Sequence, residues 1–274
     1  MARFVYDSSQ SRFPALDEMR EIFRYRELLV QFTRRDILTR YKRSVLGVAW
    51  TMLNPLGTML ILTFVFSRAF SQGRSYAVYI LSGLLAWLFF SQSTNAAMVH
   101  LVWGEGLLKR IYLPRTVFAL SAVGVGLVNL ALSLLPLALV MLLTGVPLRW
   151  SLLFLPVPVL FLALFALGMG LLVSALAAFF ADVAEMYPIL MLAWMYLTPV
   201  IYPKEYLMQF STWGVWLARL NPMYHLIDLF RLPVYEGVLP DLSQIILSGG
   251  IALGTAVIGW LVFTRKADEL AYRL

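Results

Sequence analysis

Six long runs of apolar residues, none containing Asp, Glu, Lys or Arg, constrain this chain more than any other feature of its sequence. A helix needs about 20 apolar residues to cross the ~30 Å hydrocarbon core of a bilayer. The fifth run is the shortest and contains Pro188 and Pro199. The runs cover residues 45–66, 76–98, 116–143, 152–180, 186–202 and 243–264. The sequence therefore predicts an all-α integral membrane protein with six transmembrane helices in a single transmembrane domain, residues 1–274.

The distribution of Lys and Arg predicts the orientation of these helices. An even number of spans puts both termini on one side, and if that side is the cytoplasm, 16 of the 22 Lys and Arg residues lie there. This bias follows the positive-inside rule and explains the net charge of +7 without a nucleic-acid partner. We expect a multi-pass protein of the plasma (inner) membrane with both termini cytoplasmic. Its parts are a basic, amphipathic segment at 1–44, a six-span region at 45–264 and a tail at 265–274.

Three segments are too polar or too short to span. Residues 15–32 alternate apolar and charged residues at helical spacing, which predicts an amphipathic helix in the cytoplasmic interface or one packed on a soluble partner. The loop at 99–115 combines charges with large apolar groups, which a simple connection does not need, so we expect it to dock on another protein. Residues 203–240 predict short helices that enter the outer leaflet between the last two spans. Glycines at 168, 170, 250 and 254 favour tight helix packing within the chain.

Several kinds of chemistry are missing from the sequence. The chain has no Cys and no G-x-x-x-x-G-K-[ST] motif, and its two histidines, His100 and His225, are far apart. We therefore expect no catalytic residue, no metal site and no cofactor in this chain, which is not an enzyme on its own. Ion-coupled transporters usually carry ionisable residues inside their spans, so their absence here disfavours that class. A passive channel would leave the docking loop unexplained.

Four blocks of sequence resemble the transmembrane permease subunit of type-2 ABC exporters. The blocks are RRDILTRYKRSVLGVAWTMLNPLGTMLILTFVFSRAF (34–70), LLKRIYLPRTVFALS (107–121), FFADVAEMYPILMLAWMYLTPVIYP (179–203) and LNPMYHLIDLFR (220–231). They are most similar to the branch that exports lipid-linked polysaccharides, namely O-antigen, capsule and wall teichoic acid. The resemblance implies a homodimer of permeases and two copies of a separate ABC ATPase, which binds ATP and magnesium.

The resemblance also implies roles for particular residues. The loop after the second span would hold a coupling helix seated in the ATPase, and the short helices at 204–220 and 222–235 would form an extracellular gate. The first and fifth spans would line the path and open laterally for the lipid anchor. The implied coupling residues are Glu105, Leu107, Lys109, Arg110 and Tyr112. The implied gate residues are Tyr206, Trp213, Trp216, Asn221 and Pro222.

Two further groups of residues are candidates for substrate contact. A basic cluster before the first span could bind the pyrophosphate of an undecaprenyl-linked substrate, although topology signalling and binding of anionic lipid explain it equally well. Pro55 removes a backbone donor and leaves the carbonyl of Thr51 without its helical partner, which marks either a functional bend or a harmless kink. The cluster is Arg34, Arg35, Arg40, Lys42 and Arg43. The candidate path residues are Trp50, Asn54, Pro55, Trp194 and Tyr196.

These observations favour the membrane-spanning subunit of an ATP-driven exporter of undecaprenyl-linked cell-envelope polysaccharide. Its partners would be the ATPase, a second copy of the chain, membrane lipid and the glycan. One alternative is a type-2 ABC permease for a drug, a lipid or another hydrophobic cargo. Another is an ATP-independent channel or scaffold.

Overall fold

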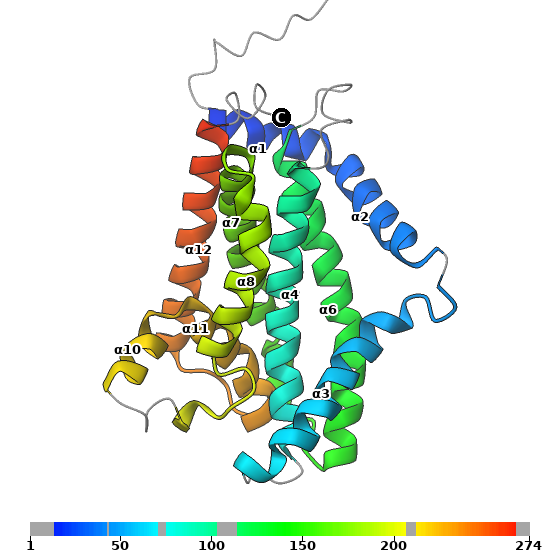
Figure 1. Ribbon diagram of the computed structural model, residues 1–274, viewed down its shortest axis with the longest axis vertical. Helices are drawn as coiled ribbons and strands as arrows, with labels where there is room; N and C mark the ends of the chain where they lie inside the picture. Colours follow the sequence, from blue (N-terminus) through cyan, green and yellow to red (C-terminus); the bar gives the residue numbers. More distant parts are fainter. Residues whose placement is uncertain (1–13, 43, 71–74, 103–113, 207–211, 267–274) are drawn as a thin grey trace, which may run out of the picture.

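The computed structural model describes residues 14–42, 44–70, 75–102, 114–206 and 212–266, and every regular element in these ranges is a helix. Four long helices, α4, α6, α7 and α12, run along the long axis of a bundle, with α8 beside them and α3 crossing obliquely (Figure 1). The α-helices are α1 (Pro14–Arg24), α2 (Arg26–Tyr41), α3 (Ala49–Phe70), α4 (Tyr76–Val102), α6 (Thr116–Thr144), α7 (Pro156–Phe179), α8 (Asp182–Leu197), α10 (Thr212–Leu220), α11 (Pro222–Arg231) and α12 (Leu242–Arg265). Two short helices of other types are η3 (Trp150–Phe154) and η4 (Leu232–Glu236).

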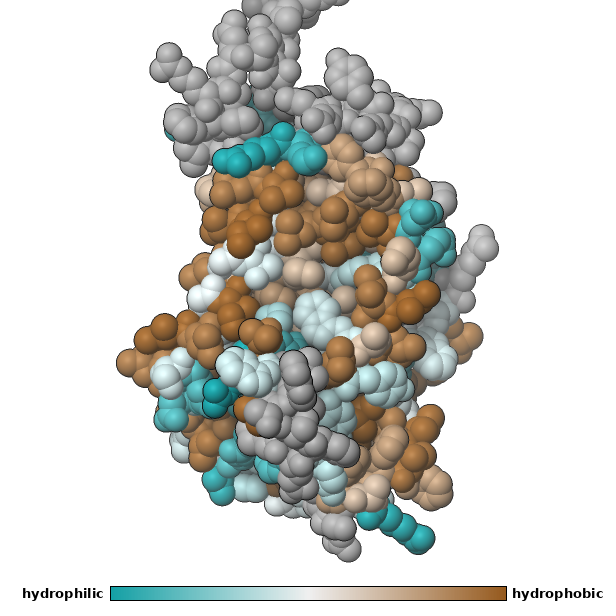
Figure 2. All heavy atoms as spheres, turned by 60° about the vertical axis from the view of Figure 1, so that its left-hand side comes forward, coloured by the Kyte–Doolittle hydropathy of each residue, from teal (hydrophilic) through white to brown (hydrophobic). Residues whose placement is uncertain are grey.

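Five segments among the described residues are long and apolar enough to cross a membrane: Ala49–Phe70, Tyr76–Val102, Thr116–Thr144, Trp150–Phe179 and Leu242–Arg265. They correspond to five of the six runs expected from the sequence. The remaining run forms α8, which has only 16 residues and is therefore about 24 Å long at 1.5 Å per residue. The sixth crossing stays a prediction. On the face shown in Figure 2, a broad band of hydrophobic side chains lies below the hydrophilic group at the upper end.

Helix α4 forms the centre of the bundle because it contacts α3, α6, α7, α8 and α11. Its side chains are largely buried, and Tyr76, Ile80 and Phe90 have less than 2% of their surface exposed. Phe90 packs against Phe165 of α7 and the edge of Trp194 of α8, at ring-centroid distances of 5.2 and 5.3 Å. Phe165 and Trp194 also lie 6.4 Å from each other, so the three rings form one cluster that joins α4, α7 and α8.

The pair α7 and α12 is held close by two glycines. A Cβ atom added to Gly259 would lie 2.8 Å from the Cα of Gly168. A Cβ atom added to Gly168 would lie 2.6 Å from the backbone nitrogen of Ala256. A Cβ atom added to Gly250 or Gly254, which the sequence also suggested for tight packing, would meet no atom of another element within 4 Å. The close approach of the two backbones is therefore made at Gly168 and Gly259.

The N-terminal amphipathic segment forms two helices, so the expectation of one helix over 15–32 is wrong. Helix α1 ends at Arg24, and α2 begins at Arg26. Helix α1 lies across one end of the bundle, beside the C-terminal end of α12, and α2 slopes away along α6 (Figure 1). The ring of Phe32 in α2 packs 5.7 Å from that of Phe118 in α6. One straight helix cannot make both sets of contacts, so the chain turns at Tyr25.

Helix α1 is tied to the bundle by the carboxylate of Glu18. The hydroxyl and the backbone N–H of Thr116, the first residue of α6, donate to Oε1 of Glu18 at 3.0 and 3.4 Å. A carboxylate is stabilising at a helix N-terminus, where backbone donors have no partner in the helix. Burial nevertheless outweighs these two bonds and raises the pKa of Glu18 above its ordinary value. Helix α1 thereby caps α6, which comes from a distant part of the chain.

Candidate functional site

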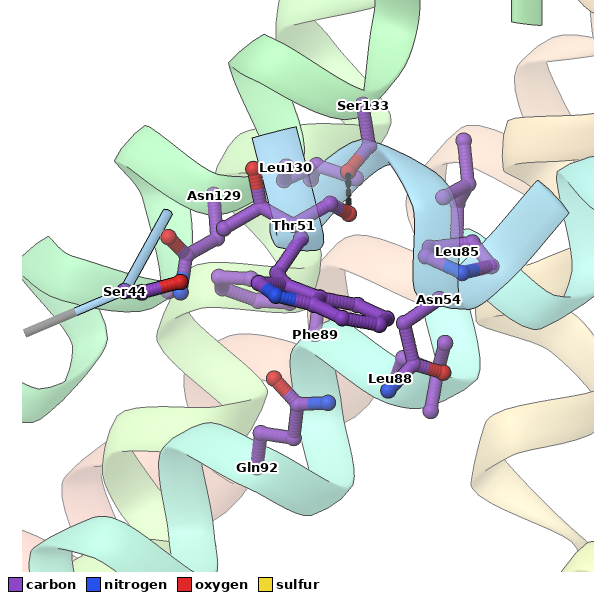
Figure 3. A pocket seen from close by; sticks show the side chains of 13 residues that line it. Ser44, Thr51, Asn54, Leu85, Leu88, Phe89, Gln92, Asn129, Leu130 and Ser133 are labelled. Atoms are coloured by element: carbon purple, nitrogen blue, oxygen red, sulfur yellow. Dashed lines mark hydrogen bonds between the residues drawn. The ribbon is translucent and has the colours of Figure 1, made fainter. Parts of the chain in front are cut away.

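A cavity of about 380 Å³ opens between α3, α4 and α6. Asn54 and Trp50 of α3, Gln92 and Phe89 of α4 and Asn129 of α6 line it. Figure 3 shows the carboxamides of Asn54, Gln92 and Asn129 around one common space. The cavity therefore combines aromatic surface with polar groups that both donate and accept hydrogen bonds.

A second cavity of about 340 Å³ lies between α4 and α8. Gln92 also lines this cavity, together with Ser91 and Asn95 of α4 and Tyr187 and Met191 of α8. The two cavities therefore adjoin the same stretch of α4 on either side of Gln92. Among the described residues that line them, none is Lys, Arg, Asp, Glu or His.

The wall of the first cavity depends on Pro55. Because Pro55 has no N–H, the carbonyl of Thr51 loses its partner within α3. The hydroxyl of Ser133 in α6 donates to this carbonyl at 3.2 Å (Figure 3). Ser133 is 4% exposed, so this bond lies inside the α3–α6 contact. The proline creates an unpaired acceptor, and the neighbouring helix uses it to hold α3 against the cavity.

A double-mutant cycle at these positions tests this coupling. We expect Ser133→Ala to lower the thermal stability of the purified protein, because a partly buried carbonyl loses its donor at a cost of about 1 kcal/mol. In the Pro55→Ala background the same change should cost much less, since residue 55 then supplies the missing N–H. Equal losses of stability in both backgrounds, measured by thermal unfolding, would show that the proline and the serine act independently.

A buried arginine anchors the segment that follows α8. Arg231, the last residue of α11, is 3% exposed. Its guanidinium donates to the carbonyls of Pro199 and Val200 at 3.0 and 3.1 Å and lies 3.7 Å from the ring centre of Tyr79. A Cβ atom at Gly83 would overlap this guanidinium, so the glycine provides the space for it. Arg231 thus fastens the chain after α8 to the central helix α4.

Asn221 holds the start of α11 in the same region. Its Oδ1 accepts from the backbone N–H of Met223 at 3.0 Å and from Nε1 of Trp194 at 2.9 Å. Its Nδ2 donates to the hydroxyl of Thr198 at 2.9 Å. Pro222 occupies the first helical position, where its missing N–H costs nothing. One side chain therefore caps α11 and fixes the end of α8.

Two ion pairs add to this assembly. Nζ of Lys204 lies 3.1 Å from Oδ1 of Asp228 and 3.2 Å from Oε1 of Glu236. Burial opposes the charge on Lys204, but the two carboxylates outweigh it and raise its pKa. The hydroxyls of Tyr76 and Tyr79 donate to the carbonyls of Ile201 and Tyr202 at 3.0 and 3.1 Å. Hydrogen bonds thus join the segment between α8 and α12 to α4, and ion pairs link parts of that segment to one another.

The structure separates the five candidate path residues. Trp50, Asn54 and Pro55 line the first cavity together. Trp194 instead donates to Asn221 and packs among Trp87, Phe90 and Phe165. The side chain of Tyr196 is 59% exposed, and neither residue lines either cavity. Substrate contact by these residues stays a prediction.

The candidate entry residues lie on and after α2. Arg34 and Arg35 are exposed, and Arg35 pairs with Asp36 at 3.1 Å and lies over the ring of Phe32. Lys42 is exposed at the end of α2, Arg40 belongs to α2, and Arg43 lies outside the described residues. Arg34, Arg35 and Lys42 line neither cavity, although Ser44, two residues after Lys42, lines the first. Recognition of pyrophosphate by this cluster stays a prediction.

The candidate coupling residues cannot be placed. Glu105, Leu107, Lys109, Arg110 and Tyr112 all lie outside the described residues. The loop that contains them joins the end of α4 to the start of α6, where Glu18 caps Thr116. Docking on an ATPase therefore stays a prediction.

The candidate gate residues lie in or next to the short helices α10 and α11 or shortly after α8. The ring of Tyr206 packs edge-on against Phe70 of α3 at 5.0 Å, and Trp216 of α10 is 55% exposed. Trp213 also belongs to α10, and Asn221 and Pro222 begin α11. A π-helix, η4, continues α11 to Glu236. A gating role stays a prediction.

Several residues in these sites were missed by the sequence reasoning. The charge distribution predicts Arg231 to lie outside the membrane, and the absence of charged residues in the spans says nothing of Gln92, Asn95 or Asn129. A signal existed for the amides, since three carboxamides within long apolar runs are unusual polar groups. No local signal marks Arg231 as buried, because its partners come from residues 79, 199 and 200.

Comparison with known proteins places the chain in a family. Residues 27–235 match the model of the ABC-2 type transporter. The chain is 30% identical over 255 residues to the O-antigen export system permease protein RfbA of Myxococcus xanthus, covering 92% of this chain and 97% of that protein. It is 26% identical over 251 residues to RfbA of Klebsiella pneumoniae, covering 90% and 93%. The polysialic acid transport protein KpsM of Escherichia coli is 23% identical over 251 residues, covering 86% and 92%.

The matched region includes both cavities and the segment anchored by Arg231. It also includes the four blocks that suggested a type-2 ABC permease, so that resemblance is confirmed. Because the family match covers most of its length, the chain belongs to the ABC-2 type transporter family.

Proposed function

We propose that this chain is the membrane-spanning subunit of an ATP-driven exporter that carries an undecaprenyl-linked cell-envelope polysaccharide out of the cytoplasm. The observation that carries the proposal is the similarity to an O-antigen export permease across 92% of the chain. The two cavities of this chain contain carboxamides and aromatic rings within a largely apolar lining and no charged residue among those described, which supports a glycan as the cargo. The alignment covers 92% of this chain and 97% of that protein, so the similarity is not confined to one shared helix.

The energy for transport comes, in this proposal, from a separate ABC ATPase that docks on the loop after α4. Two copies of each subunit form the exporter. ATP and magnesium bind to the ATPase, and its closure moves the loop and the helices connected to it. The capping of Thr116 by Glu18 supports a role for α1 in this movement, because it joins the interface helix to the helix that follows the loop.

The proposed orientation puts both termini in the cytoplasm of the producing cell, with α8 as a sixth, short crossing of the plasma membrane. The lysine and arginine distribution supports it. So does the position of α1, which lies at the same end of the bundle as the C-terminal end of α12 (Figure 1). Two chain ends on one side require an even number of crossings. The carbonyls after α8 are satisfied by Arg231, Tyr76 and Tyr79, as a non-helical segment near membrane depth requires.

Reconstitution with the partner ATPase tests the proposal. We expect the ATPase encoded beside the permease gene to co-purify with it, and undecaprenyl-linked glycan to raise its ATP hydrolysis in proteoliposomes. A complex whose ATPase carries a substituted Walker A lysine should bind the glycan and hydrolyse nothing. Stimulation by apolar drugs or plain lipids, with no response to any lipid-linked glycan, would favour the permease for hydrophobic cargo instead. Failure to find any ATPase partner would contradict both the polysaccharide exporter and the ABC permease for hydrophobic cargo.

A further inference from the structure

The two cavities beside α4 are bordered by four carboxamide side chains from three helices. Asn54, Gln92 and Asn129 line the first cavity, and Gln92 and Asn95 line the second. Figure 3 shows the three amides of the first cavity directed into it. Gln92 of α4 lines both cavities. A glycan chain that passed from one cavity to the other would therefore contact Gln92 in each of them.

These amides have no partner within the described part of the chain. None of the four makes a side-chain hydrogen bond there, whereas Asn221 makes four. Asn54, Gln92 and Asn95 are exposed, and Asn129 is half-buried. All four lie well inside helices of transmembrane length. An amide facing hydrocarbon without a partner is costly, so these groups face water or a ligand.

The chemistry of the lining selects a class of ligand. A carboxamide offers two donors and an acceptor, which matches a sugar hydroxyl in both of its roles. The hydroxyls of Thr51, Ser91 and Ser133 donate to backbone carbonyls, so they add acceptors to this set. No cation among the described lining residues can neutralise a carboxylate, and an ion moved from water into an unpaired site meets a large desolvation cost. The rings of Trp50 and Phe89 offer flat surfaces to the sugar.

We propose that the paired cavities bind an uncharged, hydroxyl-rich segment of the glycan, with Gln92 as the shared specificity residue, and that they disfavour glycans carrying carboxylates. This inference rests on the proposed export of a polysaccharide and adds the class of sugar. Gln92 hydrogen-bonds to sugar hydroxyls on both sides of α4. Asn54, Asn95 and Asn129 make further bonds as the chain moves past.

The test compares two undecaprenyl-linked oligosaccharides of equal length, one of neutral hexoses and one of uronic acids, on the permease–ATPase complex in proteoliposomes. We expect the neutral probe to stimulate ATP hydrolysis at a concentration at least about tenfold lower than the acidic probe, because the acidic sugars lose more hydration. Equal or stronger stimulation by the acidic probe would overturn this inference and leave the export function standing. No stimulation by either probe would contradict both this inference and the proposed export function.

Variants at Gln92 separate recognition from folding. Gln92→Leu should raise about tenfold the concentration of neutral probe that stimulates ATP hydrolysis, since it removes hydrogen bonds to the sugar. Gln31→Leu, at an exposed position of α2 outside both cavities, is the matched control and should change nothing. Gln92→Lys should shift the preference toward the acidic probe by giving the carboxylate a cation. Unchanged responses in both Gln92 variants would overturn the assignment.

Tryptophan fluorescence tests the role of Gln92 in glycan binding without ATP hydrolysis. Trp50 and Trp87 each line one of the cavities, so their fluorescence should change when the soluble neutral oligosaccharide binds the purified complex. The change should weaken in Gln92→Leu and persist in Gln31→Leu. An identical titration in all three proteins would contradict a role for Gln92.

Discussion

Arg231→Met is expected to produce one of the two largest losses of stability in the protein. The change removes two charge-assisted hydrogen bonds and a cation–π contact from a site that is 3% exposed. The carbonyls of Pro199 and Val200 then remain buried without a donor. We expect a loss of about 3 kcal/mol in the free energy of unfolding. Thermal unfolding of the purified protein in nanodiscs measures it.

Two further variants test whether the loss of stability in Arg231→Met comes from the buried site of the guanidinium. Arg219→Met removes an exposed arginine from α10 and should leave the melting temperature unchanged. Gly83→Ala keeps Arg231 but occupies the space of its guanidinium, so it should reproduce much of the loss. We expect export to fall with stability in Arg231→Met and Gly83→Ala. Similar melting temperatures for Arg231→Met and Arg219→Met would contradict the anchoring role.

Gly259→Ala is expected to produce the other large loss. The added methyl group would overlap the backbone of Gly168 in α7, and a backbone cannot move aside as a flexible side chain can. Helices α7 and α12 must separate along their length, which costs about 1–3 kcal/mol in overpacking and lost contacts. Gly168→Ala should have the same effect, because its methyl group meets the backbone of Thr255 and Ala256. The melting temperature of each variant measures the change.

The same helix offers a matched control for this prediction. Gly250 and Gly254 of α12 have open space around the position of an added Cβ. Gly250→Ala and Gly254→Ala should therefore be neutral or slightly stabilising, since alanine is the better helix former by about 1 kcal/mol in water. If Gly250→Ala lowered the melting temperature as much as Gly259→Ala, the close contact between α7 and α12 would not explain the effect.

The sequence predicted most of the helices because their cause is local. An uncharged apolar run of sufficient length becomes a helix in any membrane, since its backbone groups must pair within the segment. It also predicted the unpaired carbonyl of Thr51, because a proline removes a specific donor. It did not predict Ser133 as the partner of that carbonyl, since 82 residues separate the two.

The N-terminal segment shows the limit of periodicity. Residues 15–32 carry one amphipathic pattern, but α1 and α2 contact different parts of the bundle and therefore separate at Tyr25. The glycines show the same limit. The pattern at 250–254 suggested close packing as strongly as Gly168 did, yet only the crossing point of two helices decides which glycine is touched.

The sequence by itself determined the class of this protein: a helical membrane protein of the ABC-2 type, built on long apolar runs free of charged residues. Apolar length and charge distribution are properties of the chain, so they need no tertiary contact to be read. Only the tertiary structure decided that Arg231 is a buried anchor and that Trp194 holds Asn221. It also brought Asn54, Gln92 and Asn129 around one cavity. Those facts depend on which side chains of distant helices meet, and no local pattern encodes that.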